Sequence, residues 1–271
     1  MLKTFDANAF PSRRINGIAY REAGAMHTAT LPIVLLHGIG SGAASWVQQL
    51  DALGAKTRVL AWDAPGYGDS MPVAPASPQA IDYADALRGW LDALDIERCV
   101  LVGHSLGAII AGSFAATHPE RIARLLLLSP AGGYGAASED VRTQKRDSRL
   151  KMLEDLGPQG LADQRSANML SAHASEEAKQ WVRWNMARVI PHGYAQATHL
   201  LANADLKSDI ARFKGRVKVA VGSEDRITPP EACEQIAQAA GVSLHIAKGA
   251  GHAGYIEQPE TYNQIIEDTE A

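Results

Sequence analysis

Several features that would define other classes of protein are scarce in this chain of 271 residues. It contains two cysteines, Cys99 and Cys233, which lie far apart and form neither a disulfide framework nor a metal-binding spacing. Cys99 opens an apolar run and Cys233 lies in a predicted helix, which favours two buried thiols. We therefore expect no metal and no other cofactor.

Long hydrophobic segments and an excess of positive charge are also missing. The most apolar stretch, residues 99–116, is interrupted by Gly103-His104-Ser105 and Gly107, which predicts a strand, a turn and a helix rather than a membrane span. The net charge of −4 disfavours nucleic acid and anionic membranes as partners. Residues 1–8 have no apolar core of signal-peptide length, so we expect a cytoplasmic protein.

What the sequence does contain is a regular alternation of strand-like and helix-like segments. Predicted strands occur at residues 32–37, 57–62, 98–102, 122–128, 216–221 and 242–247, and residues 32–37 form a continuous apolar run. Such a run is typical of a strand buried on both faces, and the alternation of the predicted strands with helices predicts a mostly parallel, twisted sheet flanked by helices. Between two of these strands the pattern becomes helical and charged. We expect residues 1–131 and 214–271 to form the core and residues 132–213 to form an inserted helical lid.

The strongest motif is the segment Gly103-His104-Ser105-Leu106-Gly107, directly after a predicted strand and before a predicted helix. A G-x-S-x-G pattern in this context predicts a sharp, strained turn that raises a nucleophilic serine above the sheet. The following helix begins at the serine, and its free N–H groups favour negative charge there. Ser105 is the predicted nucleophile, whereas His104, at the variable position, is expected to pack rather than to catalyse.

A serine hydroxyl needs a base to remove its proton, and the base needs a third group to orient it. Among nine histidines, His252 lies in a glycine-rich loop just beyond the last predicted strand, where the chain returns to the carboxyl edge of the sheet. The loop after the strand ending at Val221 offers Glu224 and Asp225 as the acid. No acid follows the preceding strand, at residues 129–131.

The tetrahedral intermediate of acyl transfer needs N–H donors for its negative oxygen. The N–H of Leu106, just after the nucleophile, is one predicted donor. The second is expected from the loop His37–Gly42, where small residues let the backbone approach a substrate. We expect Ile39 to supply it, with Gly40 as the alternative. His37 itself is expected to pack and form hydrogen bonds.

Together these segments resemble the α/β-hydrolase superfamily over nearly the whole chain. The matching segments are residues 35–40, 62–70, 103–107, 222–225 and 251–259. The resemblance implies the α/β-hydrolase fold and a serine hydrolase, and it favours Asp225 over Glu224 as the acid. Residues 191–206 are also similar to the lid-to-core passage of 3-oxoadipate enol-lactonases, which open a small lactone in the bacterial breakdown of aromatic compounds.

A second resemblance is to the carbon–carbon hydrolases of meta-cleavage pathways, carried by residues 37–42 and 129–133. The chain departs from that group at His104, where asparagine is usual. It also departs at residues 253–255, where a tryptophan usually follows the catalytic histidine. Dehalogenases of this fold use an aspartate nucleophile, and Ser105 argues against that chemistry.

The resemblance implies hydrolysis of a small carboxylic ester or lactone through an acyl-enzyme on Ser105. The alternatives are a C–C bond hydrolase of ring-fission products, a cofactor-free acyltransferase or perhydrolase, and a non-catalytic ligand receptor. The partner is a small molecule in each case, and the choice between monomer and homodimer is open.

A lactone or a ring-fission acid carries a carboxylate, which one inward-facing arginine of the lid could bind at two points. The basic residues of the lid include Arg142, Lys145, Arg146, Arg149, Arg165, Arg183 and Arg188. We expect Arg183 or Arg188 to bind the carboxylate, with Trp184 beside them, because they lie in an amphipathic stretch that carries two tryptophans.

Overall fold

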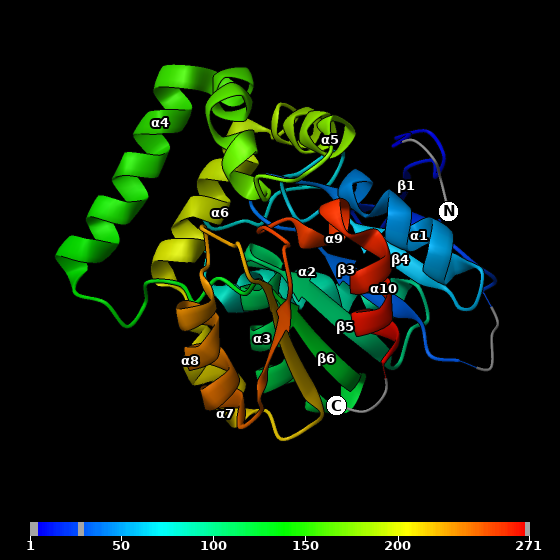
Figure 1. The fold of residues 1–271 in the computed structure, drawn as a ribbon. Coiled ribbons are helices and arrows are strands. Elements are labelled where there is room, and N and C mark those ends of the chain that lie inside the picture. Colours follow the sequence, from blue (N-terminus) through cyan, green and yellow to red (C-terminus); the bar gives the residue numbers. More distant parts are fainter. Residues whose placement is uncertain (1–4, 27–29, 269–271) are drawn as a thin grey trace.

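A sheet of eight strands runs through the structure, a computed structural model that describes residues 5–26 and 30–268 (Figure 1). The strands are β1 (Arg13–Ile15), β2 (Ile18–Ala23), β3 (Ile33–Leu36), β4 (Val59–Trp62), β5 (Cys99–His104), β6 (Ile122–Leu128), β7 (Val217–Gly222) and β8 (Leu244–Ala247). Their order is β1-β2-β4-β3-β5-β6-β7-β8. β2 pairs antiparallel with β1 and β4, and all the other pairs are parallel. The predicted mostly parallel sheet is therefore confirmed.

Helices cover both faces of this sheet. They are α1 (Val47–Gly54), α2 (Ala80–Ala93), α3 (Leu106–Thr117), α8 (Pro230–Ala240), α9 (Gly254–Glu257) and α10 (Pro259–Glu267), with 3-10 turns at Ala43–Trp46 (η1) and Pro119–Arg121 (η2). Alternate residues of a strand point to opposite faces, so Leu36 packs with α2 and α3 whereas Leu35 packs with α1 and α10. Burial of both faces is the reason why the central strands β3 and β4 read as continuous apolar runs, whereas the edge strands β1 and β8 are partly exposed.

The chain between β6 and β7 is helical. It forms α4 (Glu139–Arg165), a 3-10 turn η3 (Ser166–Met169), α5 (Glu176–Met186), α6 (Pro191–Asn203) and α7 (Leu206–Arg212). In Figure 1, α4, α5 and α6 lie together beyond one end of the strands. α7 instead packs on α3. The Leu206 side chain lies so close to Gly112 of α3 that a Cβ added at Gly112 would be 2.2 Å from Leu206 Cδ1. α7 thus packs against a helix of the predicted core, and the division into a core and a lid of residues 132–213 remains a prediction.

α4 is bent in the middle. Gly157 has φ 60° and ψ 178°, a conformation open essentially to glycine alone, and Pro158 follows it. The break turns the last part of α4 relative to the first, so both parts contribute to the cavity described below.

No helix in the described part of the chain is both long and apolar enough to cross a membrane. The expectation of a cytoplasmic protein rested in part on residues 1–4, which lie outside the described residues.

Two glycines allow the close crossing of β5, α3 and β3. A Cβ at Gly103 would lie 2.4 Å from the Gly107 carbonyl oxygen, and a Cβ at Gly107 would lie 2.4 Å from the Leu36 carbonyl oxygen. Both obstacles are backbone atoms, so no side-chain movement could relieve the overlap. This crossing fixes the position of Ser105, which lies between the two glycines.

The crossing predicts that Gly107→Ala lowers the free energy of unfolding by about 1–3 kcal/mol or more, the usual cost of overpacking. Thermal unfolding followed by circular dichroism would measure the fall in Tm. Gly132→Ala is the control, because a Cβ there would meet only Ile236 Cδ1, at an ordinary 3.7 Å. Equal Tm values for the two variants would contradict the packing argument.

Candidate active site

Ser105 lies between β5 and α3 in a strained backbone conformation. Its φ is 53° and its ψ is −112°, outside the regions that serine normally adopts. The Ser105 N–H donates to the Leu128 carbonyl at 3.0 Å, and the Ser105 carbonyl accepts from the Ala131 N–H at 3.2 Å. These bonds fix the strained residue at the wall of a cavity of about 530 Å³.

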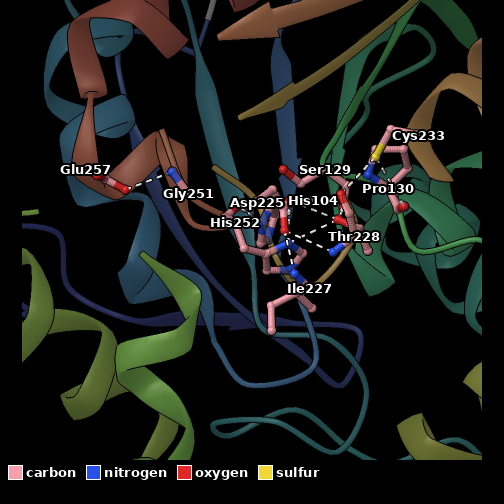
Figure 2. A network of polar contacts seen from close by, with 10 residues as sticks. All are labelled: His104, Ser129, Pro130, Asp225, Ile227, Thr228, Cys233, Gly251, His252 and Glu257. Carbon is pink, nitrogen blue, oxygen red and sulfur yellow. Dashed lines mark hydrogen bonds and ion pairs between the residues drawn. The ribbon is translucent and has the colours of Figure 1, made fainter. Parts of the chain in front are cut away.

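His252 is held by a carboxylate on one side of its ring. Its Nδ1 lies 2.8 Å from Asp225 Oδ2, and both residues are buried (Figure 2). Because Nδ1 faces the carboxylate, it carries the ring proton. Nε2 has no hydrogen-bond partner among the described residues, and His252 and Ser105 line the same cavity. In the part of the chain that the structure describes, Nε2 is therefore the ring nitrogen left without a hydrogen bond beside this cavity.

Asp225 is a buried carboxylate with several donors. Oδ1 accepts from the backbone N–H groups of Ile227 at 2.8 Å and Thr228 at 2.9 Å. Burial alone would raise the pKa of Asp225, but the hydrogen bond and charge of His252, together with these N–H groups, outweigh burial and lower the pKa to about 2. The carboxylate that contacts His252 is thus Asp225, and not the neighbouring Glu224.

Thr228 joins this carboxylate to the end of β6. Its hydroxyl lies 3.0 Å from Asp225 Oδ2, 3.0 Å from the Ser129 carbonyl and 3.1 Å from His252 Nδ1. Figure 2 shows these contacts converging beside the ring of His252. Sequence reasoning missed Thr228. Its place three residues after an aspartate, typical of a turn closed by an Asp side chain, was the available signal.

His104 supports His252 from the other side. Its Nε2 lies 2.9 Å from the His252 carbonyl oxygen, and the two ring centroids are 4.8 Å apart. Burial, and then the charge of His252, lower the pKa of His104 to about 3, so its ring is neutral at ordinary pH. His104 packs and forms hydrogen bonds, as the sequence led us to expect.

The loop between β3 and η1 lies directly against Ser105. A Cβ at Gly38 would lie 3.1 Å from Ser105 Cβ, so the backbone of this loop passes within reach of a substrate. The Leu106 N–H opens α3 and has no partner inside the helix. Ile39 and Gly40 both line the cavity. Leu106 with Ile39 or Gly40 remains the predicted set of donors for the negative oxygen.

His37 fixes the start of this loop. Its Nδ1 lies 2.8 Å from the Gly38 carbonyl, to which it donates, and its Nε2 accepts from the Ala64 N–H at 2.9 Å. Burial lowers the pKa of His37, which favours the neutral ring that this arrangement needs. The Tyr67 hydroxyl donates to the Ile39 carbonyl at 2.9 Å and fixes the next peptide.

The expected carboxylate-binding residues of the lid are not at the cavity. Arg183 is exposed and pairs with Asp163, its Nε lying 2.7 Å from Oδ1. Arg188 is also exposed and stacks 3.8 Å above the Trp184 ring. All three expected residues, Arg183, Trp184 and Arg188, lie outside the cavity lining because the inner face of α5 is formed by other residues, namely Val182, Asn185 and Met186.

The arginines that do line the cavity come from α4. Arg149 precedes the bend at Gly157, and Arg165 ends the helix after it. Both are partly buried. They replace Arg183 and Arg188 as candidates for binding a substrate carboxylate.

The fold agrees with what comparison with known proteins shows. Residues 33–265 match the model of the alpha/beta hydrolase family, and the chain belongs to that family. It is 32% identical over 250 residues to a Pseudomonas putida protein, 2-hydroxy-6-oxononadienedioate/2-hydroxy-6-oxononatrienedioate hydrolase 2, a match that covers 87% of this chain and 86% of that protein. The protein is accordingly a hydrolase.

Two further relatives extend the comparison. A 2-hydroxy-6-oxo-6-phenylhexa-2,4-dienoate hydrolase from Comamonas testosteroni is 28% identical over 271 residues, covering 93% of this chain and 90% of that protein. Among solved structures, an enol-lactonase from Burkholderia xenovorans LB400 matches with a TM-score of 0.83 and 26% identity. That match covers 94% of this chain and 98% of the lactonase.

The geometry predicts that Asp225→Asn lowers kcat by about 10⁴-fold, because a neutral amide neither holds the Nδ1–H tautomer nor stabilises the imidazolium. Steady-state hydrolysis of an activated ester would measure the loss. Glu224→Gln is the matched control and should retain wild-type kcat. A comparable loss in both variants would contradict the assignment of the acid.

A second prediction concerns stability and pH. The pKa of Asp225 is about 2 in the folded protein, below its ordinary value of 3.8, so its charge stabilises the fold fully above about pH 4. This contribution is lost as the pH falls toward 2. The difference in unfolding free energy between the wild type and Asp225→Asn should therefore narrow over that interval in denaturant titrations, and a constant difference would contradict the lowered pKa.

Proposed function

We propose that this hydrolase cleaves a small carboxylic ester or lactone through an acyl-enzyme on Ser105. The observation that carries the proposal is the arrangement around His252. Its Nδ1 is bound to Asp225, and its Nε2 is unpartnered in the cavity that Ser105 also lines. A nucleophile, a base and a group that orients the base define acyl transfer of this type.

The reaction follows from these positions. His252 Nε2 takes the proton of Ser105 as the serine oxygen attacks the carbonyl carbon, and the N–H groups of Leu106 and of Ile39 or Gly40 hold the negative oxygen. His252 then donates its proton to the leaving alcohol. In the second half, water attacks the acyl-enzyme by the same proton transfers and releases the acid. Asp225 stabilises the imidazolium in both halves.

The cavity suits a small molecule. Its volume of about 530 Å³ lies within the range of small-molecule sites, and Ile39, Val182 and Met186 give it apolar walls. These walls favour a compact, partly apolar acyl group.

Charge in the cavity favours a substrate that bears a carboxylate. Arg149 and Arg165 contact neutral groups: Arg149 Nη1 lies 3.3 Å from the Tyr194 hydroxyl, and Arg165 Nη1 lies 3.7 Å from Met152 Sδ. Neither guanidinium pairs with a carboxylate among the described residues, although the chain carries a net charge of −4. A substrate carboxylate would provide the missing partner.

Hydrolysis of a C–C bond in a ring-fission acid is the second candidate. It is favoured by the names of two relatives, which are hydrolases of 2-hydroxy-6-oxo acids. The same triad and the same arginines would serve such a substrate, in keeping with a role in the degradation of aromatic compounds. Against it stand His104 and Tyr255, at positions where that group usually carries other residues. Transfer of the acyl group to an alcohol or to peroxide differs only in the acceptor.

We expect Ser105→Ala to lower the hydrolysis of p-nitrophenyl acetate, butyrate and octanoate by about 10⁴–10⁶-fold, because no acyl-enzyme can form. Mass spectrometry of the wild type should show the acyl adduct on Ser105. Ser148→Ala, an exposed serine on α4, is the control. A wild type that hydrolyses ring-fission acids but none of these esters would favour the second candidate.

The arginine assignment predicts that Arg149→Gln and Arg165→Gln each raise KM for a hemiester of a dicarboxylic acid. A hydrogen bond to a charged group is worth about 1.5–3 kcal/mol, so the expected increase is about 10–100-fold. KM for the matching neutral diester should change little. Arg183→Gln is the control. An effect confined to that variant would mean that an arginine of α5, and not of α4, binds the substrate carboxylate.

A further inference from the structure

The loop that carries His252 is in contact with the lid on both sides of the histidine. The Ala253 N–H donates to the Met169 carbonyl at 2.7 Å. A Cβ at Gly251 would lie 2.5 Å from the Ser171 nitrogen, so the two backbones touch there. The residues before and after His252 are thus held by the segment 169–171, which links η3 to α5.

Glu257 closes this contact. Its Oε2 accepts from the Gly251 N–H at 3.0 Å and from the Ser171 N–H at 3.0 Å. Its Oε1 accepts from the Ser171 hydroxyl. Figure 2 shows Glu257, at the end of α9, bound to Gly251 one residue before His252. One carboxylate therefore holds two chain segments, at Ser171 and Gly251, that lie 80 residues apart in sequence and are brought together by the fold.

All the hydrogen-bond donors to this carboxylate are neutral. No lysine or arginine pairs with Glu257 in the described part of the chain. Two backbone N–H groups and one hydroxyl therefore satisfy it, and they come from both segments. Hydrogen bonds to an ionised acceptor are stronger and more directional than neutral ones, which suits a group that fixes geometry.

The same segments line the cavity. Met169 contributes from the lid side, and His252 and Ala253 contribute from the loop side. A substrate that contacts Met169 on the lid side of the cavity therefore also lies against the loop that carries the base.

We propose that Glu257 is a positioning residue that couples the lid to His252, by holding Ser171 and Gly251 on one carboxylate. The inference rests on the proposed role of His252 as the base. The contact sets the position of the His252 imidazole relative to Ser105. It aligns the base when residues 169–171 pack against the loop that carries His252. Glu257 touches no reacting atom, and its effect passes through the backbone at Gly251.

The test compares Glu257→Gln with the wild type. The amide can still accept from both N–H groups, but it lacks the negative charge that strengthens these hydrogen bonds, so it should hold both segments less firmly. We expect the rate at which a fluorophosphonate labels Ser105 to fall about tenfold, because a hydrogen bond to a charged group is stronger than a neutral one by about 1–1.5 kcal/mol. kcat for p-nitrophenyl acetate should fall by a similar factor with little change in KM.

Hydrogen–deuterium exchange supplies a readout that a purely local defect would not move. In Glu257→Gln the amides of both segments, residues 166–174 and 249–255, should exchange faster together. Glu260→Gln removes the same charge from an exposed position on α10 and should match the wild type in every measurement. Ser171→Ala removes one donor to Glu257, together with the acceptor of the His173 N–H, and should show a smaller effect in the same direction. Its exchange and labelling data test the coupling if Glu257→Gln fails to fold.

The outcomes separate this inference from the proposed function. A labelled wild type and an equally fast Glu257→Gln would overturn the coupling and leave the proposed function intact. A wild type that no fluorophosphonate labels would overturn the proposed function. The exchange data would then decide the coupling alone: joint loosening of both segments supports it, and loosening of one segment overturns it.

Discussion

The strained backbone of Ser105 is the constraint on which the site depends. Its φ of 53° and ψ of −112° cost on the order of 1–3 kcal/mol and persist only where surrounding structure enforces them. Here the enforcement comes from the crossing at Gly103 and Gly107 and from the hydrogen bond to Leu128. Because β5 lies between β3 and β6, the same crossing brings the loop after β3 against the serine.

The positions of the other two residues of the proposed triad follow from strand order. β7 and β8 run parallel to β5, so the loops after them reach the edge where Ser105 stands. This is why the sequence was enough to predict the fold and to single out Ser105 and His252 as candidates: each depends on a short local pattern next to a strand. The choice between Glu224 and Asp225 was different, because adjacent residues in one loop have the same spacing. The turn that aims Asp225 at His252 and at the N–H groups of Ile227 and Thr228 decides it.

The helices between β6 and β7 show what the sequence alone could not predict. An amphipathic helix predicts that one face is buried, but not which cavity that face lines. On α5 the inner face is formed by Val182, Asn185 and Met186, while Arg183 pairs with Asp163 on the outside. The bend at Gly157 brings arginines from α4 to the cavity instead, and that bend depends on a single glycine conformation. Contacts between distant segments, such as Glu257 with Ser171, leave no local pattern to find.

Burial also sets the electrostatics of the proton transfer. Two further histidines, His37 and His104, lie near the site, and burial lowers the pKa of each so that neither adds positive charge. Asp225, in contrast, keeps its charge despite burial, because His252 and two backbone N–H groups stabilise the carboxylate. An imidazolium that forms on His252 therefore meets a negative charge at Nδ1 and no competing cation from these rings. In the proposed mechanism, one nearby carboxylate would stabilise the imidazolium that forms when His252 takes the Ser105 proton, and the neutral histidines hold the geometry in which that carboxylate would act.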